Sequence, residues 1–404
     1  MLTMKHRIAL TKVVRTRYQK ASKKEKTKIL SEMVANCGYN RSYARRILCS
    51  LTTTRKMDRK GRGGKKIRKY SPRRRKYDAS VFYPLRTLWL AADGICGQRL
   101  QPFIPELLGV LEKKKEIKVN KVVRRKLLRV GSATIDRMLS AVKRQYKLKG
   151  KATTKPGTLL RSTIPIRIFS DWDEQKPGFM ETDLVAFCGE SVKGDYVNGL
   201  DLTDIATGWV CLEAVMGKAQ ARVHQAVDNT RERLPFPLLG LDSDNGTEFI
   251  NWLLKRYCDE KQITFTRIRP YRKNDNCFVE QKNYTVLRRF LGYARYETKE
   301  QLEIIQEILK LVEPYVNFFQ PSMKLTGKER VGPKTKKKHD TAKTPYRRLL
   351  NCGILNEGRK KELKEYYESL NPLEMKRKIN KLTEKLNKTI VTKIHDLTNI
   401  SSVT

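Results

Sequence analysis

The stretch from residue 239 to residue 291 restricts the possible folds most, because it places acidic residues at the ends of predicted elements. The apolar run 237–242 predicts a short strand followed by Ser-Asp-Asn-Gly, so Asp244 is expected at the strand tip, just before a turn. In α/β folds, ligands bind at strand tips. Glu280 follows the loop 269–277 and opens a run with helical periodicity, so we expect it in the first turn of a helix.

A third acidic residue, Asp183, lies inside an alternating apolar run. The run 179–187 is flanked by Pro177-Gly178 and by Gly189, and it predicts a strand. A carboxylate is out of place there unless something binds it. Asp183, Asp244 and Glu280 are therefore candidates for one metal site of the kind that supports phosphoryl transfer.

Each of these acids has a simpler explanation when taken alone. A single Asp or Glu is usually a surface charge, and Asp-Asn-Gly is a common turn. Three acids in order, each on a suitable element, favour a metal site. Asp242 is an alternative ligand, because strand alternation points it to the same face as Asp244. Glu248 is interpreted as an acid at the start of a helix, since an apolar run follows it.

The motif DNGTEF, with 35 residues between Asp244 and Glu280, resembles the DDE-type transposases of bacterial insertion sequences, whose catalytic core is similar to that of retroviral integrases. The resemblance covers residues 168–350 and includes RPYRKNDNCFVEQKN, NFFQPSMKL and TPYRRLL. It implies that Asp183, Asp244 and Glu280 are the metal-binding catalytic acids. It also implies cleavage at the element end by water, followed by attack of the freed 3′-hydroxyl on target DNA.

The expected cofactor follows from the ligand type. Carboxylate oxygens suit hard divalent cations, so two Mg²⁺ or Mn²⁺ ions are expected. Two such ions, about 3.5–4 Å apart, can activate the attacking oxygen and neutralise the leaving oxygen of an in-line displacement. The eight cysteines and four histidines are scattered without a C-x-x-C pair, which argues against a structural zinc site.

The charge of the chain indicates its partner. A net charge of +44 repels itself unless it meets a polyanion, and nucleic acid is the expected one. Residues 1–77 carry 26 Lys and Arg against 3 Asp and Glu, whereas residues 178–292 carry 15 against 16. The resemblance implies DNA partners, namely terminal inverted repeats and target DNA, and a homo-oligomer in the synaptic complex. Without a signal peptide or a long apolar span, we expect a cytoplasmic, nucleoid-associated protein without membrane contact.

The N-terminal region, residues 1–54, is predicted to be a helix-turn-helix DNA-binding region. Ser22 and Glu25 form a plausible capping box, and a glycine turn precedes a basic helix at 41–49. A plain helical hairpin with a solvated basic face is the alternative. The DNA-binding candidates of the second helix are Arg41, Arg45 and Arg46.

The next segments are assigned from composition and periodicity. Residues 55–77 are a basic linker, interpreted as an arm that orders on DNA or merely as a solubilising linker. Residues 78–150 form a second helix-turn-helix-like region, with Pro102 and Pro105 in a connection, Ser132 as an N-cap and Arg137 as a DNA-binding candidate. Residues 151–163 are a further linker.

Residues 164–320 are predicted to be a ribonuclease-H-like α/β catalytic core. The expected strands are 179–187, 196–204, 209–215, one at 238 and 264–268, and the expected helices are 218–234, 247–261, one from 279 and 302–319. The basic loop before Glu280 and the helix after it supply further DNA-binding candidates: Arg269, Arg272, Lys273 and Lys282.

Residues 321–404 are predicted to be a basic, helical C-terminal region. The basic segment 324–343 is expected to loop along DNA, and residues 374–390 have helical periodicity. This helix either dimerises or packs on its own chain. The sequence therefore predicts a multidomain DNA transposase. The alternatives are a catalytically silent DNA-binding regulator derived from one, and a ribonuclease-H-like nuclease that cuts without joining.

Overall fold

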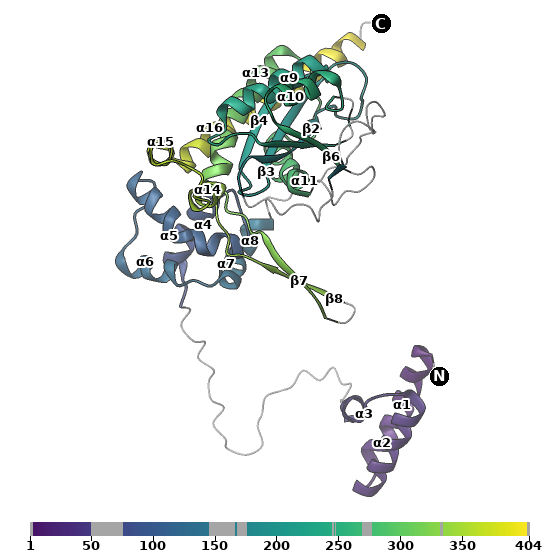
Figure 1. Ribbon diagram of the computed structural model, residues 1–404. Coiled ribbons are helices and arrows are strands. Elements are labelled where there is room, and N and C mark those ends of the chain that lie inside the picture. Colours follow the sequence, from purple (N-terminus) through teal and green to yellow (C-terminus); the bar gives the residue numbers. More distant parts are fainter. Residues whose placement is uncertain are drawn as a thin grey trace. The chain divides into compact units, whose positions relative to one another are not determined.

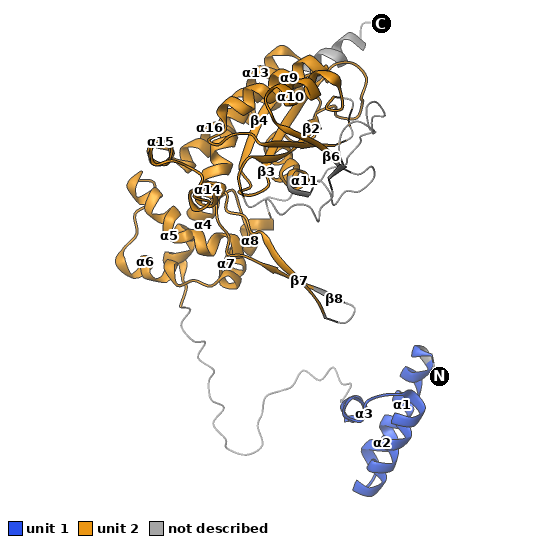
Figure 2. Cartoon of the chain, in the orientation of Figure 1, with its two compact units in different colours: residues 1–74 blue, residues 75–404 orange. Residues whose placement is uncertain are grey.

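The computed structural model describes residues 3–49, 76–144, 166–167, 176–244, 246, 248–268, 277–331 and 334–401. The chain divides into two compact units, residues 1–74 and residues 75–404 (Figure 2). The described residues include no helix that is both long and apolar enough to cross a membrane.

The described residues of unit 1 form three helices, α1 (Met4–Lys20), α2 (Lys23–Cys37) and α3 (Arg41–Cys49). The predicted capping box is confirmed, because Ser22 and Glu25 exchange hydrogen bonds at the start of α2. Gly38 ends α2 in the left-handed conformation, with φ of +64°, which a glycine adopts without strain. Ile29, Met33 and Leu48 are buried in a core of the unit's own.

Unit 2 is built on a mixed six-stranded sheet (Figure 1). Its strands follow the order β1-β6-β5-β2-β3-β4. β2, β3 and β4 pair antiparallel, whereas β5, β6 and β1 join β2 in parallel. The strands are β1 (Ile166–Arg167), β2 (Phe179–Ala186), β3 (Val197–Asp204), β4 (Val210–Met216), β5 (Gly240–Ser243) and β6 (Thr264–Ile268). The predicted mixed α/β core is thus confirmed.

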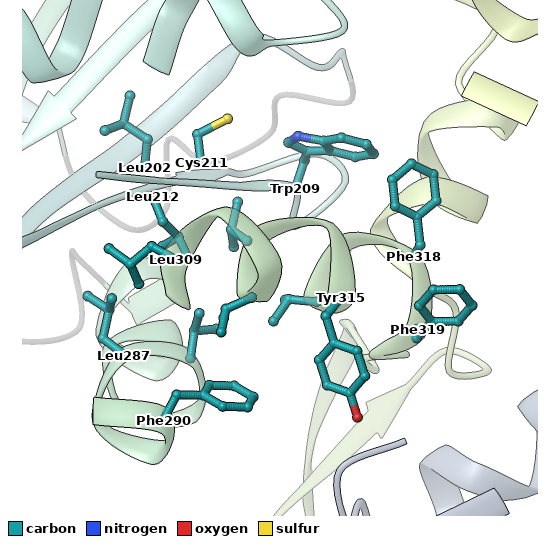
Figure 3. Close-up of a cluster of buried hydrophobic side chains, with 14 of the residues drawn as sticks. Leu202, Trp209, Cys211, Leu212, Leu287, Phe290, Leu309, Tyr315, Phe318 and Phe319 are labelled. Carbon is teal, nitrogen blue, oxygen red and sulfur yellow. The ribbon is translucent and has the colours of Figure 1, made fainter. Parts of the chain in front are cut away.

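Helices flank this sheet. α13 packs against β4, and α11 packs against β2 and β3. Figure 3 shows Leu309 of α13 beside Leu212 of β4, and Tyr315 near Phe290. The helices of this part are α9 (Gln220–Arg233), α10 (Trp252–Glu260), α11 (Cys277–Lys282), the π-helical η4 (Asn283–Arg288), α12 (Arg289–Leu291) and α13 (Lys299–Phe319).

The helix that follows Asp244 is shorter than predicted. α10 begins at Trp252 instead of residue 247, because the Asn251 side chain accepts a hydrogen bond from the Leu254 backbone N–H at 2.9 Å and caps the helix there. Glu248 therefore lies in a turn before the helix, and its interpretation as a helix-start acid is wrong.

Residues 78–144 form five helices that share their hydrophobic core with the sheet. They are α4 (Ala79–Ala91), α5 (Gly97–Lys113), α6 (Lys121–Leu128), α7 (Ser132–Met138) and α8 (Ser140–Lys143). The predicted connection at Pro102 and Pro105 is wrong, since both lie inside α5. Burial of α5's apolar face outweighs the lost backbone hydrogen bonds. Ser132 is the first residue of α7 instead of its cap, which is Gly131.

The C-terminal region differs from the prediction in one respect. Its basic segment is a two-stranded antiparallel ribbon of β7 (Leu325–Val331) and β8 (Lys334–His339), where a loop was expected. Described side chains on both faces of the ribbon, such as Arg330 and Lys336, are exposed, and its sequence has no apolar periodicity to reveal a strand. The helices α14 (Pro345–Asn351), α15 (Glu357–Ser369) and α16 (Pro372–Ser401) follow.

α16 packs on α13 of its own chain, which is one of the two arrangements that the sequence left open. Met375, Ile379 and Leu386 of α16 are buried in the core of unit 2. The Gln301 amide also donates a hydrogen bond to the Thr389 hydroxyl at 3.0 Å.

Candidate active site

Asp183 and Asp244 lie on neighbouring parallel strands. The register pairs Glu181 with Asp242 and Thr182 with Ser243. One further residue along that register brings Asp244, just past the end of β5, level with Asp183 in β2. Both side chains are half-buried. The sheet thus brings together two of the three predicted acids at the carboxyl end of a parallel strand, where α/β folds bind ligands.

The two carboxylates interact electrostatically. Burial, and then the charge of Asp183, raises the pKa of Asp244 to about 7, although the Gly246 N–H donates to its Oδ1 at 2.9 Å. Burial also raises the pKa of Asp183, against hydrogen bonds from the Leu184 N–H at 2.8 Å and the Asn283 amide at 2.5 Å. Two half-buried carboxylates that repel each other are a donor set suited to a hard divalent cation.

A lysine and a second glutamate lie beside this pair. Lys218 Nζ is 3.1 Å from Glu248 Oε1. Burial lowers the pKa of Lys218, but the Glu248 carboxylate outweighs this effect and raises the pKa above its ordinary value. The charge of Asp244 adds to the increase. The charge of Glu248 in turn raises the pKa values of Asp183 and Asp244. The sequence alone predicts Glu248 at a helix start and does not single out Lys218.

Glu280 lies on the helix that covers the acidic face of β2. Two hydrogen bonds hold α11 and the start of η4, which continues it: the Val279 N–H donates to Glu181 Oε2 at 2.7 Å, and Asn283 donates to Asp183. Glu280 lies between these two anchors in sequence, and its side chain is exposed. Within the described residues, no three His, Cys, Asp or Glu side chains are grouped closely enough to hold a metal ion.

A buried carboxylate that the sequence reasoning missed lies directly opposite Asp183. The antiparallel register pairs Asp201 of β3 with Asp183. Asp201 is fully buried, accepts a hydrogen bond from the Thr203 hydroxyl at 2.9 Å, and has its pKa raised to about 7 by burial. An acid inside the predicted strand 196–204 is the same signal that identified Asp183 and could have identified Asp201.

Lys282, predicted to bind DNA, is half-buried near Asp201. Burial lowers its pKa to about 8, while the charge of Asp201 favours its protonated form. The Lys282 ammonium group thus compensates the charge of the Asp201 carboxylate, which lies opposite Asp183.

The other predicted ligands and binding residues are placed as follows. Asp242 is buried within β5 and accepts a hydrogen bond from the Thr266 hydroxyl at 2.5 Å, so of the two aspartates Asp244 lies nearer the strand end. Arg137 is exposed on α7. Arg41, Arg45 and Arg46 are exposed on α3 of unit 1, and Arg269, Arg272 and Lys273 lie outside the described residues.

Comparison with known proteins finds similarity both in sequence and in structure. No family model matches the chain. The uncharacterized protein y4rM of Sinorhizobium fredii (strain NBRC 101917 / NGR234) is 35% identical over 347 residues, which cover 86% of this chain and 96% of that protein. The crystal structure of the catalytic core domain of BIV integrase matches 43% of this chain and 94% of its own, with 19% identity and a TM-score of 0.30.

Proposed function

Since this chain belongs to the family of the uncharacterized protein y4rM, whose name assigns no activity, we propose its function from the site itself: a DNA transposase of the DDE type. It cleaves DNA at the ends of an insertion sequence and joins the freed 3′-hydroxyl to target DNA. The observation that carries this proposal is the pairing of Asp183 and Asp244, two mutually repelling carboxylates at the end of β5.

The site residues have distinct roles in this reaction. Asp183 and Asp244 would hold the metal, and Glu280, whose side chain is exposed on α11, would complete the ligand set. Asn283 and the Leu184 N–H fix the orientation of the Asp183 carboxylate. Lys218 balances the charge of Glu248 beside the pair. The bound Mg²⁺ or Mn²⁺ ions supply the positive charge that activates the attacking oxygen and stabilises the leaving one.

The DNA partners are assigned by charge. The excess of Lys and Arg in residues 1–77 suits phosphate binding, and we place the contact with terminal inverted repeats at the exposed arginines of α3. Two element ends must be held together for joining, so the active form is a homo-oligomer on DNA.

The test is strand transfer of a labelled element-end duplex into plasmid DNA, with Mg²⁺ or Mn²⁺. The native protein is expected to give joined product and Asp244→Asn none. Asp259→Asn is the matched control, because it makes the same chemical change on an exposed residue of α10. It should join DNA as the native protein does.

The other outcomes separate the alternatives. Nicked DNA without joining identifies a nuclease, and specific binding without cleavage identifies a regulator. Joining that survives Asp244→Asn means that another carboxylate holds the metal.

A further inference from the structure

The β7–β8 ribbon is a concentrated basic surface outside the candidate active site. Residues 325–339 contain six Lys and Arg against one acid, Glu329. Described side chains of both faces are exposed: Arg330 and Lys337 on one face, and Lys336 and Lys338 on the other. Figure 1 shows the two strands extending away from the sheet of unit 2.

The ribbon has little to stabilise it in isolation. A two-stranded sheet without an apolar face is marginally stable in water. The register makes Arg330 and Lys337 diagonal neighbours on one face, and like charges within reach of each other repel. The Lys338–Glu329 ion pair, at 3.6 Å, is largely exposed and contributes little. A polyanion between the basic side chains would remove this repulsion.

The base of the ribbon, by contrast, is firmly attached. Asp340 accepts hydrogen bonds from the Lys324 N–H and from Arg348, both at 2.6 Å, and Arg348 also donates to the Ser322 carbonyl. The Lys324 ammonium bonds the carbonyls of Ile205 and Ala206, in the turn between β3 and β4. The ribbon is therefore held in a fixed direction relative to the sheet that carries Asp183.

We propose that this ribbon binds duplex DNA by entering the major groove. The groove of B-form DNA, about 12 Å wide, admits a two-stranded ribbon, whose strands are about 4.8 Å apart. Basic side chains on both faces can then reach the phosphates of the two strands that border the groove. The inference deepens the proposed function and rests on it only in taking DNA as the partner.

The first test is the salt dependence of binding to an element-end duplex, measured without metal. Each phosphate contact contributes about 0.9 to the slope of log affinity against log salt concentration. Replacing Lys336 and Lys337 by Gln should lower that slope by about 1.8. The control is Lys361→Gln with Lys364→Gln, which removes the same charge from exposed positions of α15 and should leave the slope unchanged. Equal slopes for the native protein and the Lys336/Lys337 variant would overturn the proposal.

The second test identifies the groove. Native protein should protect guanine N7 atoms, which face the major groove, from methylation, and the Lys336/Lys337 variant should lose that protection. The major groove of an RNA duplex is too narrow for side chains to read, so the variant should bind RNA no more weakly than the α15 control does. Unchanged N7 protection, or an equal loss of RNA and DNA binding, would contradict major-groove entry.

Failure of this inference is distinguishable from failure of the proposed function. Neither binding test requires catalysis, and Asp244→Asn retains the ribbon. If the native protein joins DNA and the Lys336/Lys337 variant has an unchanged salt slope, the proposed function stands and the ribbon proposal fails. If the native protein never joins DNA but the variant has the lower slope, the proposed function fails and the ribbon proposal stands.

Discussion

At the scale of single residues, the site depends on how the half-buried carboxylate of Asp183 is held. Asn283 donates to Asp183 at 2.5 Å, from a helix to a strand 100 residues earlier. Asn283→Ala removes this donor and should lower the free energy of unfolding by about 1–3 kcal/mol, because the half-buried Asp183 carboxylate loses a hydrogen-bond partner. Urea unfolding measures the change.

A double-mutant cycle with Asp183→Ala isolates the bond itself. The two substitutions should be non-additive by at least about 0.5 kcal/mol. Additive effects would show that the Asn283 amide does not stabilise Asp183.

The sequence predicted some of these residues and missed others for a physical reason. Asp183 and Asp244 were identifiable because a carboxylate within a strand pattern, or at its tip, conflicts with the local periodicity. The half-burial of Lys282 near Asp201 depends on which face of α11 meets β3, and helical periodicity around a single lysine does not specify that. Asp201 carries the same sequence signal as Asp183, an acid inside a strand pattern, and the register adds that the two lie directly opposite each other.

At the scale of elements, η4 packs closely over Gly199 of the sheet. A Cβ at Gly199 would lie 3.1 Å from Leu287 Cδ1 and 3.2 Å from a ring carbon of Phe187. Gly199→Ala should therefore destabilise the protein by about 1–3 kcal/mol through overpacking. Gly109→Ala is the control: Gly109 lies inside α5 with nothing within 4 Å, so this change should stabilise by about 0.5–1 kcal/mol. Thermal unfolding measures both: a lower melting temperature for Gly199→Ala and a higher one for Gly109→Ala, relative to the native protein, support this packing. Equal shifts in melting temperature contradict it.

The stabilisation that Asp340 provides at the base of the ribbon depends on pH, and the pKa of Asp340 sets the direction of that dependence. Burial raises the pKa of Asp340, but hydrogen bonds from Arg348 and from the Lys324 N–H keep this pKa below its ordinary value. The stabilisation is therefore present at neutral pH, above the unfolded pKa of about 4, and is lost as the pH falls through the lower folded value.

Asp340→Asn should cost about 1–3 kcal/mol at pH 7 and progressively less below about pH 4. The free energy of unfolding of both proteins, measured across this range, checks it. A difference that does not change with pH would mean that the charge of Asp340 contributes nothing.

The type of an element, helix or strand, was predictable where the hydrophobic periodicity was strong. The prediction failed where tertiary packing or full exposure determined the structure. The strands 179–187 and 264–268 alternate or are bounded clearly, and they formed as β2 and β6. α5 continues through two prolines because its apolar face is buried, which local propensity does not register. The ribbon was missed for the opposite reason: a strand pair that is exposed on both faces shows no apolar periodicity in its sequence.

At the scale of the whole molecule, the two units have separate hydrophobic cores. Removing residues 1–74 deletes 24 Lys and Arg against 3 Asp and Glu but no residue of the unit 2 core. The remaining chain should unfold at the melting temperature of unit 2 in the full protein. Its affinity for an element-end duplex should fall steeply, with a shallower salt slope. A large drop in melting temperature would show that unit 2 depends on unit 1.

The helices of residues 78–144 belong to the core of unit 2 in this account. The Tyr315 hydroxyl donates to the Ala91 carbonyl at 2.8 Å, and the side chains of α4 and α5 join the same buried cluster as the sheet. Composition and charge along the chain separate basic from neutral segments, but they carry no information about which segments share a core. The sequence could not predict this association.

The most direct test of the central claim asks which glutamate completes the site with Asp183 and Asp244. Strand transfer is measured for Glu280→Gln and Glu248→Gln, two substitutions that remove the same charge. We assign Glu280 as the third metal ligand and Glu248 as the partner of Lys218. We therefore expect that Glu280→Gln abolishes joining while Glu248→Gln still joins DNA. Joining by Glu280→Gln, with none by Glu248→Gln, would contradict the assignment of the three acids.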